Sequence, residues 1–345
     1  MELAARRHMA PDVAGAIELC YTNGWTDGLP VVPPTADRVE AMLKAGGLAP
    51  DHTLAYIEDR QVSVTVEKAA INAVMAGCKP EYMPVIAATV EALGDKLYGY
   101  HGPATSTSGS AVFMVVNGPI ARELDMNCGH NLFGPGWRAN ATMGRAIRLI
   151  MRNVFGSIPG ELDQSCMGHG GKYSFCIAEN EAESPWPPFH TTRGFKAEQN
   201  VVTIFAALSP HQYSNRLSAD PEGVLETCCA HMKISAGAGR QQQHILVFGG
   251  EHSIIFKRAG WSREQVQQFC FDHSQSTVAE LKRAHVVPGE VAPEDERTLL
   301  PLVRTPQDFL VISAGGKAGV QSAFIPGWGS MNGSQSVSRE IRRPA

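Results

Sequence analysis

The sequence has no long apolar run and no surplus of positive charge. A membrane-spanning helix needs about 18 to 20 consecutive apolar residues, and no window of that length is free of polar side chains. The 30 basic residues stand against 34 acidic ones, for a net charge of −4, so no bulk attraction to a nucleic-acid backbone is indicated. Residues 1–15 contain no apolar signal core. We therefore expect a soluble, cytoplasmic protein that has neither a membrane nor a nucleic acid as its partner.

Cysteine is also scarce. Eight cysteines in 345 residues are too few for a disulfide scaffold of this size, so we expect mostly reduced thiols. No complete phosphate-binding loop or dinucleotide fingerprint occurs, and the cofactor, if any, is unknown. What the chain does contain is 43% hydrophobic residues with 34 glycines and 22 prolines, a composition typical of a globular, turn-rich protein.

Apolar β-rich runs alternate with helical patterns along the chain. This alternation predicts an α/β fold with mixed, partly parallel sheets flanked by helices. Strands are expected over residues 62–66, 111–116, 201–208, 244–248 and 309–313. Three of the runs lead directly into glycine-containing turns, and ligands of parallel sheets favour the crevice beyond the carboxyl ends of the strands. These turns are therefore expected to line a site.

Residues 112–126 and 245–261 share the order strand, glycine turn and amphipathic helix. This similarity indicates either two similar lobes or the order of elements that any α/β fold has. The Pro-rich segment 184–188 is the best candidate for a crossover between them, because successive prolines exclude both helix and central strand. We place a boundary there, with an N-terminal α/β lobe over 1–184 and a C-terminal α/β lobe over 185–345. One continuous domain is the alternative.

Reactive side chains cluster between residues 127 and 181, separated by turn glycines. Such a mixture of thiol, imidazole, amine and carboxylate favours a reaction centre over simple packing. In the predicted chemistry the thiolate of Cys176 is activated by His169 or Lys172, and protons move through Glu179 or Glu181. The alternative for Cys176 is a small buried apolar side chain in a strand-like run.

Glu179 and Glu181 follow that run and fall on one face if the extended backbone continues. Paired carboxylates raise the pKa of one another, so one of them could serve as a general acid. A plain acidic turn is the alternative interpretation.

Several polar residues are expected to bind an anionic substrate. Arg138 stands beside the start of an amphipathic helix, where backbone N–H groups and a forked guanidinium favour a carboxylate or phosphate, and Asn140 or Thr142 could cap that helix. A stiff proline-containing arm over 24–35 could deliver a carboxylate to the site. The predicted substrate-binding residues are Asp27, Asn131, Arg138, Asn140 and Lys317.

Cysteines and histidines in the same region also suggest a metal site as an alternative. Cys128 and His130 precede Cys166, His169, Cys176 and His190, and these are zinc ligand types. Their spacing is irregular and no pair of Cys-x-x-Cys knuckles is present, so no metal ligand is assigned.

Four segments, over residues 24–35, 129–140, 169–181 and 325–329, give the chain a family resemblance. It resembles a bacterial family, itself largely uncharacterised, whose members are companions or fusion partners of small proteins with a selenocysteine-or-cysteine Gly-Ser-Cys motif. No Gly-Ser-Cys tripeptide occurs in this chain, so the chemistry of that motif does not transfer to it. The resemblance implies an enzyme, or an enzyme subunit, of thiol-linked small-molecule metabolism.

Together these observations predict an enzyme of lyase, hydrolase or reductase type that acts on a small anionic metabolite. The alternatives are a metal-dependent enzyme with Cys and His ligands, and a non-catalytic subunit that binds a thiol-bearing protein partner. We expect a homo-oligomer.

Overall fold

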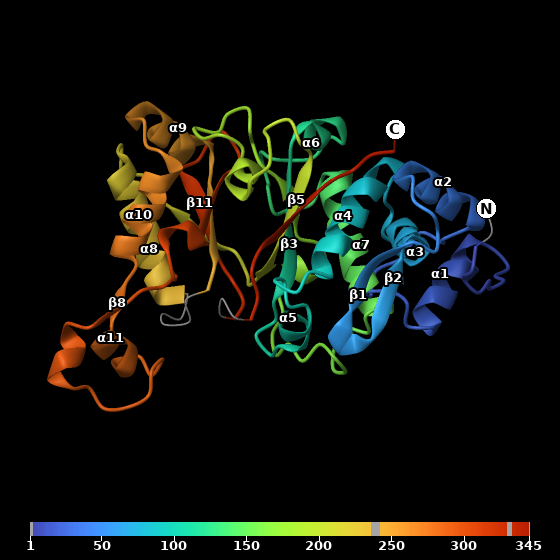
Figure 1. The fold of residues 1–345 in the computed structure, drawn as a ribbon, viewed down its shortest axis with the longest axis horizontal. Helices are drawn as coiled ribbons and strands as arrows, with labels where there is room; N and C mark the ends of the chain where they lie inside the picture. The colour runs from blue at the N-terminus through green and yellow to red at the C-terminus, as the bar shows by residue number, and fades with distance from the viewer. Residues whose placement is uncertain (1–2, 236–241, 330–332, 345) are drawn as a thin grey trace.

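The computed structural model describes residues 3–235, 242–329 and 333–344. Two four-stranded sheets face each other, and helices cover the outer face of each sheet, so the layers run helix, sheet, sheet, helix across the molecule (Figure 1). The sheets are mixed parallel and antiparallel. The predicted α/β class with mixed, partly parallel sheets is therefore confirmed.

The first sheet has the strand order β12-β5-β3-β4. β3 and β4 are parallel, with Met114 opposite Cys176, whereas β5 runs antiparallel to β3 and β12 antiparallel to β5. The bounds of its strands are β3 (Ala111–Asn117), β4 (Cys176–Ala178), β5 (Val201–Ala207) and β12 (Val337–Glu340). Two of these strands follow residue 184, so both halves of the chain build this sheet.

The second sheet has the strand order β10-β7-β11-β6. β7 and β10 are parallel, and β11 lies antiparallel to both β7 and β6. The bounds of its strands are β6 (His211–Ser214), β7 (His244–Phe248), β10 (Phe309–Ser313) and β11 (Gln321–Pro326). The central strands are apolar at almost every position because both faces of each sheet are covered.

Alternate residues of each strand enter different cores. Phe113 and Ile177 of the first sheet pack between the sheets against Ile245 and Ile312 of the second. Neighbouring positions such as Cys176 point the other way, into the core under the first helix layer. Period-two alternation across two buried faces explains why the strands read as continuous apolar runs.

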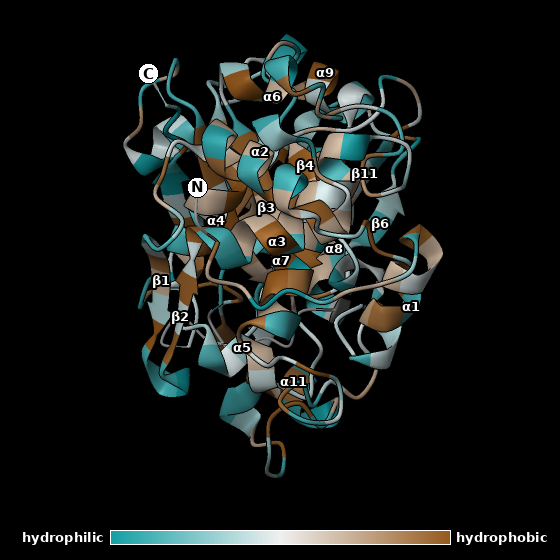
Figure 2. Cartoon of the chain, turned by 90° about the vertical axis from the view of Figure 1, so that its right-hand side faces the viewer, coloured by the Kyte–Doolittle hydropathy of each residue, from teal (hydrophilic) through white to brown (hydrophobic). Residues whose placement is uncertain are grey.

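Helices α4 (Met83–Leu93) and α7 (Arg138–Asn153) cover the first sheet, with α2 (Ala36–Gly46) and α3 (Val66–Ala76) outside them. Apolar residues gather on α3, α4 and α7 in Figure 2. On the other side α8 (Pro221–Ser235), α9 (Gly250–Ala259) and α10 (Arg263–His273) cover the second sheet. A capping box between Ser262 and Gln265 is present at the start of α10.

Shorter elements complete the fold. They are α1 (Val13–Thr22), α5 (His101–Thr105), α6 (Pro119–Glu123), α11 (Val278–Arg283), the 3-10 turns Gly170–Lys172 and Phe189–Arg193, and the small strands β1 (Thr53–Ile57), β2 (Val62–Thr65), β8 (Ser276–Thr277) and β9 (Leu299–Leu300). α11 and β8 extend away from the layers (Figure 1). In the part of the chain that the structure describes, no helix is both long enough and apolar enough to span a membrane.

The Pro-rich segment after β4 crosses from the first sheet to the far helix layer, where Trp186 packs in the core beneath α8 to α10. The chain then returns to the first sheet as β5, and the role of this segment as a crossover between two lobes stays a prediction. The boundary between 184 and 185 and the likeness of two lobes stay predictions.

Candidate functional site

The carboxyl ends of parallel strands from both sheets meet on one side of the molecule. The Asn180 N–H, just after β4, donates to the Ser313 carbonyl at the end of β10 (2.8 Å), and the Gly315 N–H donates to the Cys128 carbonyl (2.9 Å). A cavity of about 340 Å³ lies beside these contacts, lined by Gly249, by the turn that follows Ser313 and by residues 131–134. Two of the three turns predicted to line a site therefore line this cavity.

The third of the predicted turns, which begins at Asn117 after β3, binds a pair of carboxylates. Nδ2 of Asn117 donates to Oε2 of Glu179 (2.6 Å) and to Oε1 of Glu181 (2.9 Å), and the Gly118 N–H also donates to Glu181 (2.7 Å). Gly118 has φ +91°, and a Cβ there would lie 2.3 Å from the Gln199 carbonyl oxygen. Only glycine fits this position. Glu179 and Glu181 therefore lie together, as predicted, although β4 ends at Ala178 and the extended backbone does not reach Glu181.

Glu179 is buried, with 4% of its surface exposed. Its Oε2 accepts a second bond from the Phe189 N–H (2.6 Å), while its Oε1 has no hydrogen-bond partner and lies 3.6 Å from Nη2 of Arg263. Burial raises the pKa of Glu179 to about 7, and the charge of Arg263 and the bonds from Phe189 and Asn117 only partly oppose this rise. Glu179 therefore changes its charge near neutral pH.

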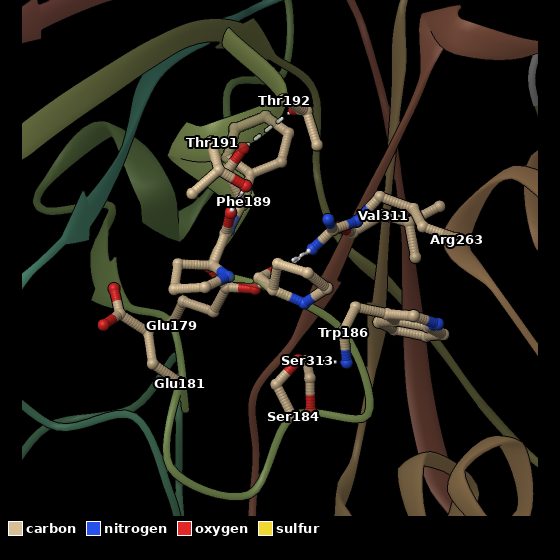
Figure 3. Close-up of polar contacts among 12 residues, drawn as sticks. Glu179, Glu181, Ser184, Trp186, Phe189, Thr191, Thr192, Arg263, Val311 and Ser313 are labelled. Atoms are coloured by element: carbon tan, nitrogen blue, oxygen red, sulfur yellow. Dashed lines mark hydrogen bonds and ion pairs between the residues drawn. The ribbon is translucent and has the colours of Figure 1, made fainter. Parts of the chain in front are cut away.

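Arg263 is the charged partner of Glu179, and the sequence analysis did not predict it. It begins α10 and is buried, and its guanidinium extends toward Glu179 (Figure 3). It donates to the Val311 carbonyl (3.2 Å) and the Pro187 carbonyl (2.9 Å) and lies 5.7 Å from the ring centroid of Trp186. Burial lowers the pKa of Arg263, and the charge of Glu179 opposes this change. The fixed fork of donors holds the cation in one orientation.

A cavity of about 520 Å³ opens beside Arg263. Its other walls come from Trp186 and Trp261, from Lys257 and from the hydroxyl-bearing pair Thr191 and Thr192. It thus combines flat apolar walls with two cations and one carboxylate, that of Glu264, and the excess positive charge suits a small organic anion.

Lys172, predicted to be catalytic, forms an ion pair with Asp163 and not with Glu179 or Glu181. Its Nζ lies 2.7 and 2.8 Å from the two oxygens of Asp163 and 2.6 Å from Oγ of Ser165, and Arg148 also binds Asp163 (2.8 Å). Burial alone would raise the pKa of Asp163, but the bonds from Lys172 and Ser165 outweigh it and lower the pKa to about 2. Burial lowers the pKa of Lys172, against the effect of Asp163.

His169 lies near this group. Its Nδ1 accepts a bond from the Gly171 N–H (3.1 Å), its ring packs edge-on against Phe175 at a centroid separation of 5.9 Å, and burial lowers its pKa. Cys176 follows Phe175 in the chain and therefore points to the opposite face, into the core that also contains Cys78. Burial raises the pKa of the Cys176 thiol far above its usual value.

The structure thus corrects the prediction that the His169 imidazole, the Lys172 amine and the Cys176 thiol lie around one cavity. Among the described residues, none of the four best-formed cavities is lined by all three side chains. An alternating strand separates the thiol from the imidazole, and the amine pairs with Asp163. The contacts of Cys176 agree with the alternative of a buried apolar side chain.

The predicted substrate-binding residues also lie apart. Asp27 binds the guanidinium of Arg145 through both oxygens (2.7 and 2.8 Å). Arg138 donates twice to the Gly77 carbonyl (3.0 and 2.9 Å). Asn131 lines the 340 Å³ cavity, and Lys317 pairs with Glu183 (2.5 Å) at the exposed turn beyond β10. These residues do not share one pocket.

The expectation that Asn140 or Thr142 caps α7 is wrong, because the helix already begins at Arg138 after Trp137. The Asn140 amide instead binds both backbone groups of Asn127 (2.8 and 3.0 Å) and the Cys176 carbonyl (3.1 Å). It joins the helix to the loop before it and to β4, which is a structural role.

The suggested metal ligands do not assemble. Cys166 is exposed whereas Cys176 and His190 are buried, and Nε2 of His190 contacts the Lys196 carbonyl (2.9 Å). Across residues 3–235, 242–329 and 333–344, no group of three or more His, Cys, Asp or Glu side chains is arranged to hold a metal ion.

Comparison of the chain with protein-family models, with curated proteins and with solved structures finds no match. The resemblance stated above accordingly stays a prediction, and the argument for function depends on the geometry of the site.

Proposed function

We propose that this chain is an enzyme of small-molecule metabolism that acts on an anionic substrate by proton transfer, with Glu179 as the acid–base group. The observation that carries the proposal is the unpartnered Oε1 of Glu179, 3.6 Å from an arginine that lines a 520 Å³ cavity. A proton carrier works best when its pKa lies near the working pH, and the pKa of Glu179 is about 7.

Arg263 connects the cavity with the carboxylate. A substrate anion that binds Arg263 from the cavity would compete with Glu179 for the guanidinium. Loss of that attraction favours the protonated carboxyl, because the cation is what lowers the pKa of Glu179 most. Binding of the substrate therefore prepares Glu179 to donate a proton.

The other polar groups fix the carboxyl in place. Asn117 and the Phe189 N–H hold Oε2, which leaves Oε1 as the atom that carries the transferable proton. The charge of Glu181 further raises the pKa of Glu179. A carboxyl with one oxygen held and the other free to carry a proton favours a lyase or a hydrolase, because both reaction types need a positioned proton donor.

The test measures the exchange of carbon-bound hydrogen for deuterium in small carboxylic acids, together with product formation. The protein is incubated in deuterated water with a panel of small mono- and dicarboxylates, and ¹H NMR follows the loss of C–H signals and the appearance of products. We expect at least one acid to react with the wild type and a loss of at least about a hundredfold in Glu179→Gln, the usual scale for removing a general acid.

Glu222→Gln, which removes an exposed carboxylate of α8, is the matched control and should react like the wild type. Equal rates for wild type and Glu179→Gln would show that Glu179 does not move the proton. Reaction that requires an added thiol-bearing protein would instead support the subunit alternative.

A further inference from the structure

A further cavity lies at the N-terminal end of the molecule, away from Glu179 and its neighbours. It measures about 810 Å³ and is enclosed by residues 3–12, by α1 and by the facing parts of α2 and α3. Figure 1 places α1 and the N-terminus on one side of the layers and α10 on the other. Its volume lies within the range of about 300 to 1,000 Å³ that holds small organic ligands.

The interior wall of this N-terminal cavity is apolar. Leu19, Trp25, Val39, Ile71 and Met75 line it. An alkyl chain that fills the space would remove these side chains from water, which the hydrophobic effect favours.

Two buried polar side chains of the cavity, Glu67 and Asn72, already have partners in the protein. The two oxygens of Glu67 accept the Ala4 N–H (3.0 Å) and the Ala5 N–H (2.8 Å). Oδ1 of Asn72 accepts the amide of Asn153 (2.7 Å). A ligand body in the cavity therefore needs no polar group to match them.

The rim carries two cations. Arg6 and Arg7 line the opening, both are exposed, and within the described part of the chain neither forms an ion pair. The acidic residue at the same opening, Asp12, accepts the Gly15 N–H (2.7 Å) as the cap of α1. Two guanidinium groups thus stand against one carboxylate at the opening, and a guanidinium binds a carboxylate well.

We propose that the N-terminal cavity binds a small amphipathic carboxylate, with its alkyl chain against Trp25 and Met75 and its head group on Arg6 and Arg7. The two halves of such a ligand match the two halves of the site. This proposal does not depend on the role of Glu179.

Calorimetric titration with octanoate tests it, with 1-octanol as the uncharged ligand of the same chain length. We expect octanoate to bind the wild type at least about tenfold more tightly than octanol, the factor given by 1.4 kcal/mol. The double variant Arg6→Ala/Arg7→Ala should lose this preference and bind both ligands alike, whereas Arg122→Ala, an exposed arginine on α6, should keep it. Equal affinity of the wild type for both ligands, or no binding of either, would overturn the proposal.

Thiol protection locates the ligand without any substitution. Cys20 lines the cavity and Cys166 is exposed elsewhere. Octanoate should slow labelling of Cys20 by N-ethylmaleimide, measured by peptide mass mapping, and leave the labelling of Cys166 unchanged. Protection of neither thiol, or of both to the same extent, contradicts binding at this cavity.

Discussion

Nη2 of Arg263 and Oε1 of Glu179 lie 3.6 Å apart, and both side chains are buried. The distance is too long for a hydrogen bond, so the arginine attracts the carboxylate without fully stabilising its charge. Burial therefore dominates, and the pKa of Glu179 is raised to about 7. Such a carboxyl is costly to stability above neutral pH, and it is well suited to proton transfer.

The raised pKa of Glu179 predicts that the protein loses stability between about pH 4.5 and pH 7. In that window the unfolded chain has ionised this carboxyl, whose ordinary pKa is 4.5, while the folded protein still holds the proton. Unfolding therefore releases a proton, and the free energy of unfolding falls as the pH rises. The loss is about 3 kcal/mol, and above pH 7 it is complete.

Urea denaturation from pH 4.5 to pH 8 measures this effect. Glu179→Gln removes the titrating group, so its stability should fall less across the window than that of the wild type. Glu222→Gln controls for the loss of one negative charge at an exposed site. Parallel pH profiles for wild type and Glu179→Gln would mean that Glu179 is ionised throughout.

Asp163 is predicted to be more important for stability than Lys172. Asp163→Asn leaves both Arg148 and Lys172 without their carboxylate, at a cost of about 3 kcal/mol. Lys172→Met should cost less, because Arg148 still neutralises Asp163. Denaturation midpoints at pH 7 compare the two, and a larger loss in Lys172→Met would contradict the assignment.

The same carboxylate has the opposite pH dependence to Glu179. Its pKa is lowered to about 2, so the stability that it supplies is present above its ordinary pKa of 3.8 and is lost as the pH falls toward 2. Asp163→Asn should therefore differ from the wild type by less at pH 2 than at pH 7.

The sequence predicted the central strands β3, β5 and β7, because their burial on both faces leaves an apolar run, but it did not predict the equally central β11. β7 and β10 lie within the predicted bounds, and β3 and β5 differ by one residue at their ends. The short β12 was not predicted, because its pattern of one buried and three half-buried residues carries no such signature.

The site was harder to predict, because its partners come from elements far apart in the chain. The sequence placed Glu179 and Glu181 together by strand alternation, whereas their common partner is the amide of Asn117 at the end of β3. The approach of Arg263 depends on how α10 packs against the edge of β10, which no local pattern reveals. Lys172 meets Asp163 through an irregular loop, where neither helical nor strand spacing applies. The sequence therefore indicated the reactive groups but not which of them act together.

A double-mutant cycle should show that Asp27 and Arg145 stabilise the fold together. Arg145 binds both oxygens of Asp27 and also the Pro30 carbonyl (2.9 Å), and so holds the proline-containing arm on α7. The pair is largely buried, and its attraction lowers the pKa of Asp27 against the effect of burial. We expect a coupling energy of about 1 to 2 kcal/mol from Asp27→Asn, Arg145→Lys and the double variant. Additive losses in thermal unfolding would show that the contact contributes nothing.

Thiol reactivity should follow burial and not proximity to His169. Cys166 is exposed, whereas Cys176 and Cys78 are buried, and burial raises the pKa of both buried thiols, that of Cys78 to about 12. Since the thiolate is the nucleophile, a small excess of iodoacetamide on the folded protein should modify Cys166 first and leave Cys176 intact until urea is added. Peptide mass mapping over time measures the order. Modification of Cys176 before Cys166 in the native protein would contradict the placement of Cys176 in the core. The Cys176 thiol would then again be a candidate nucleophile.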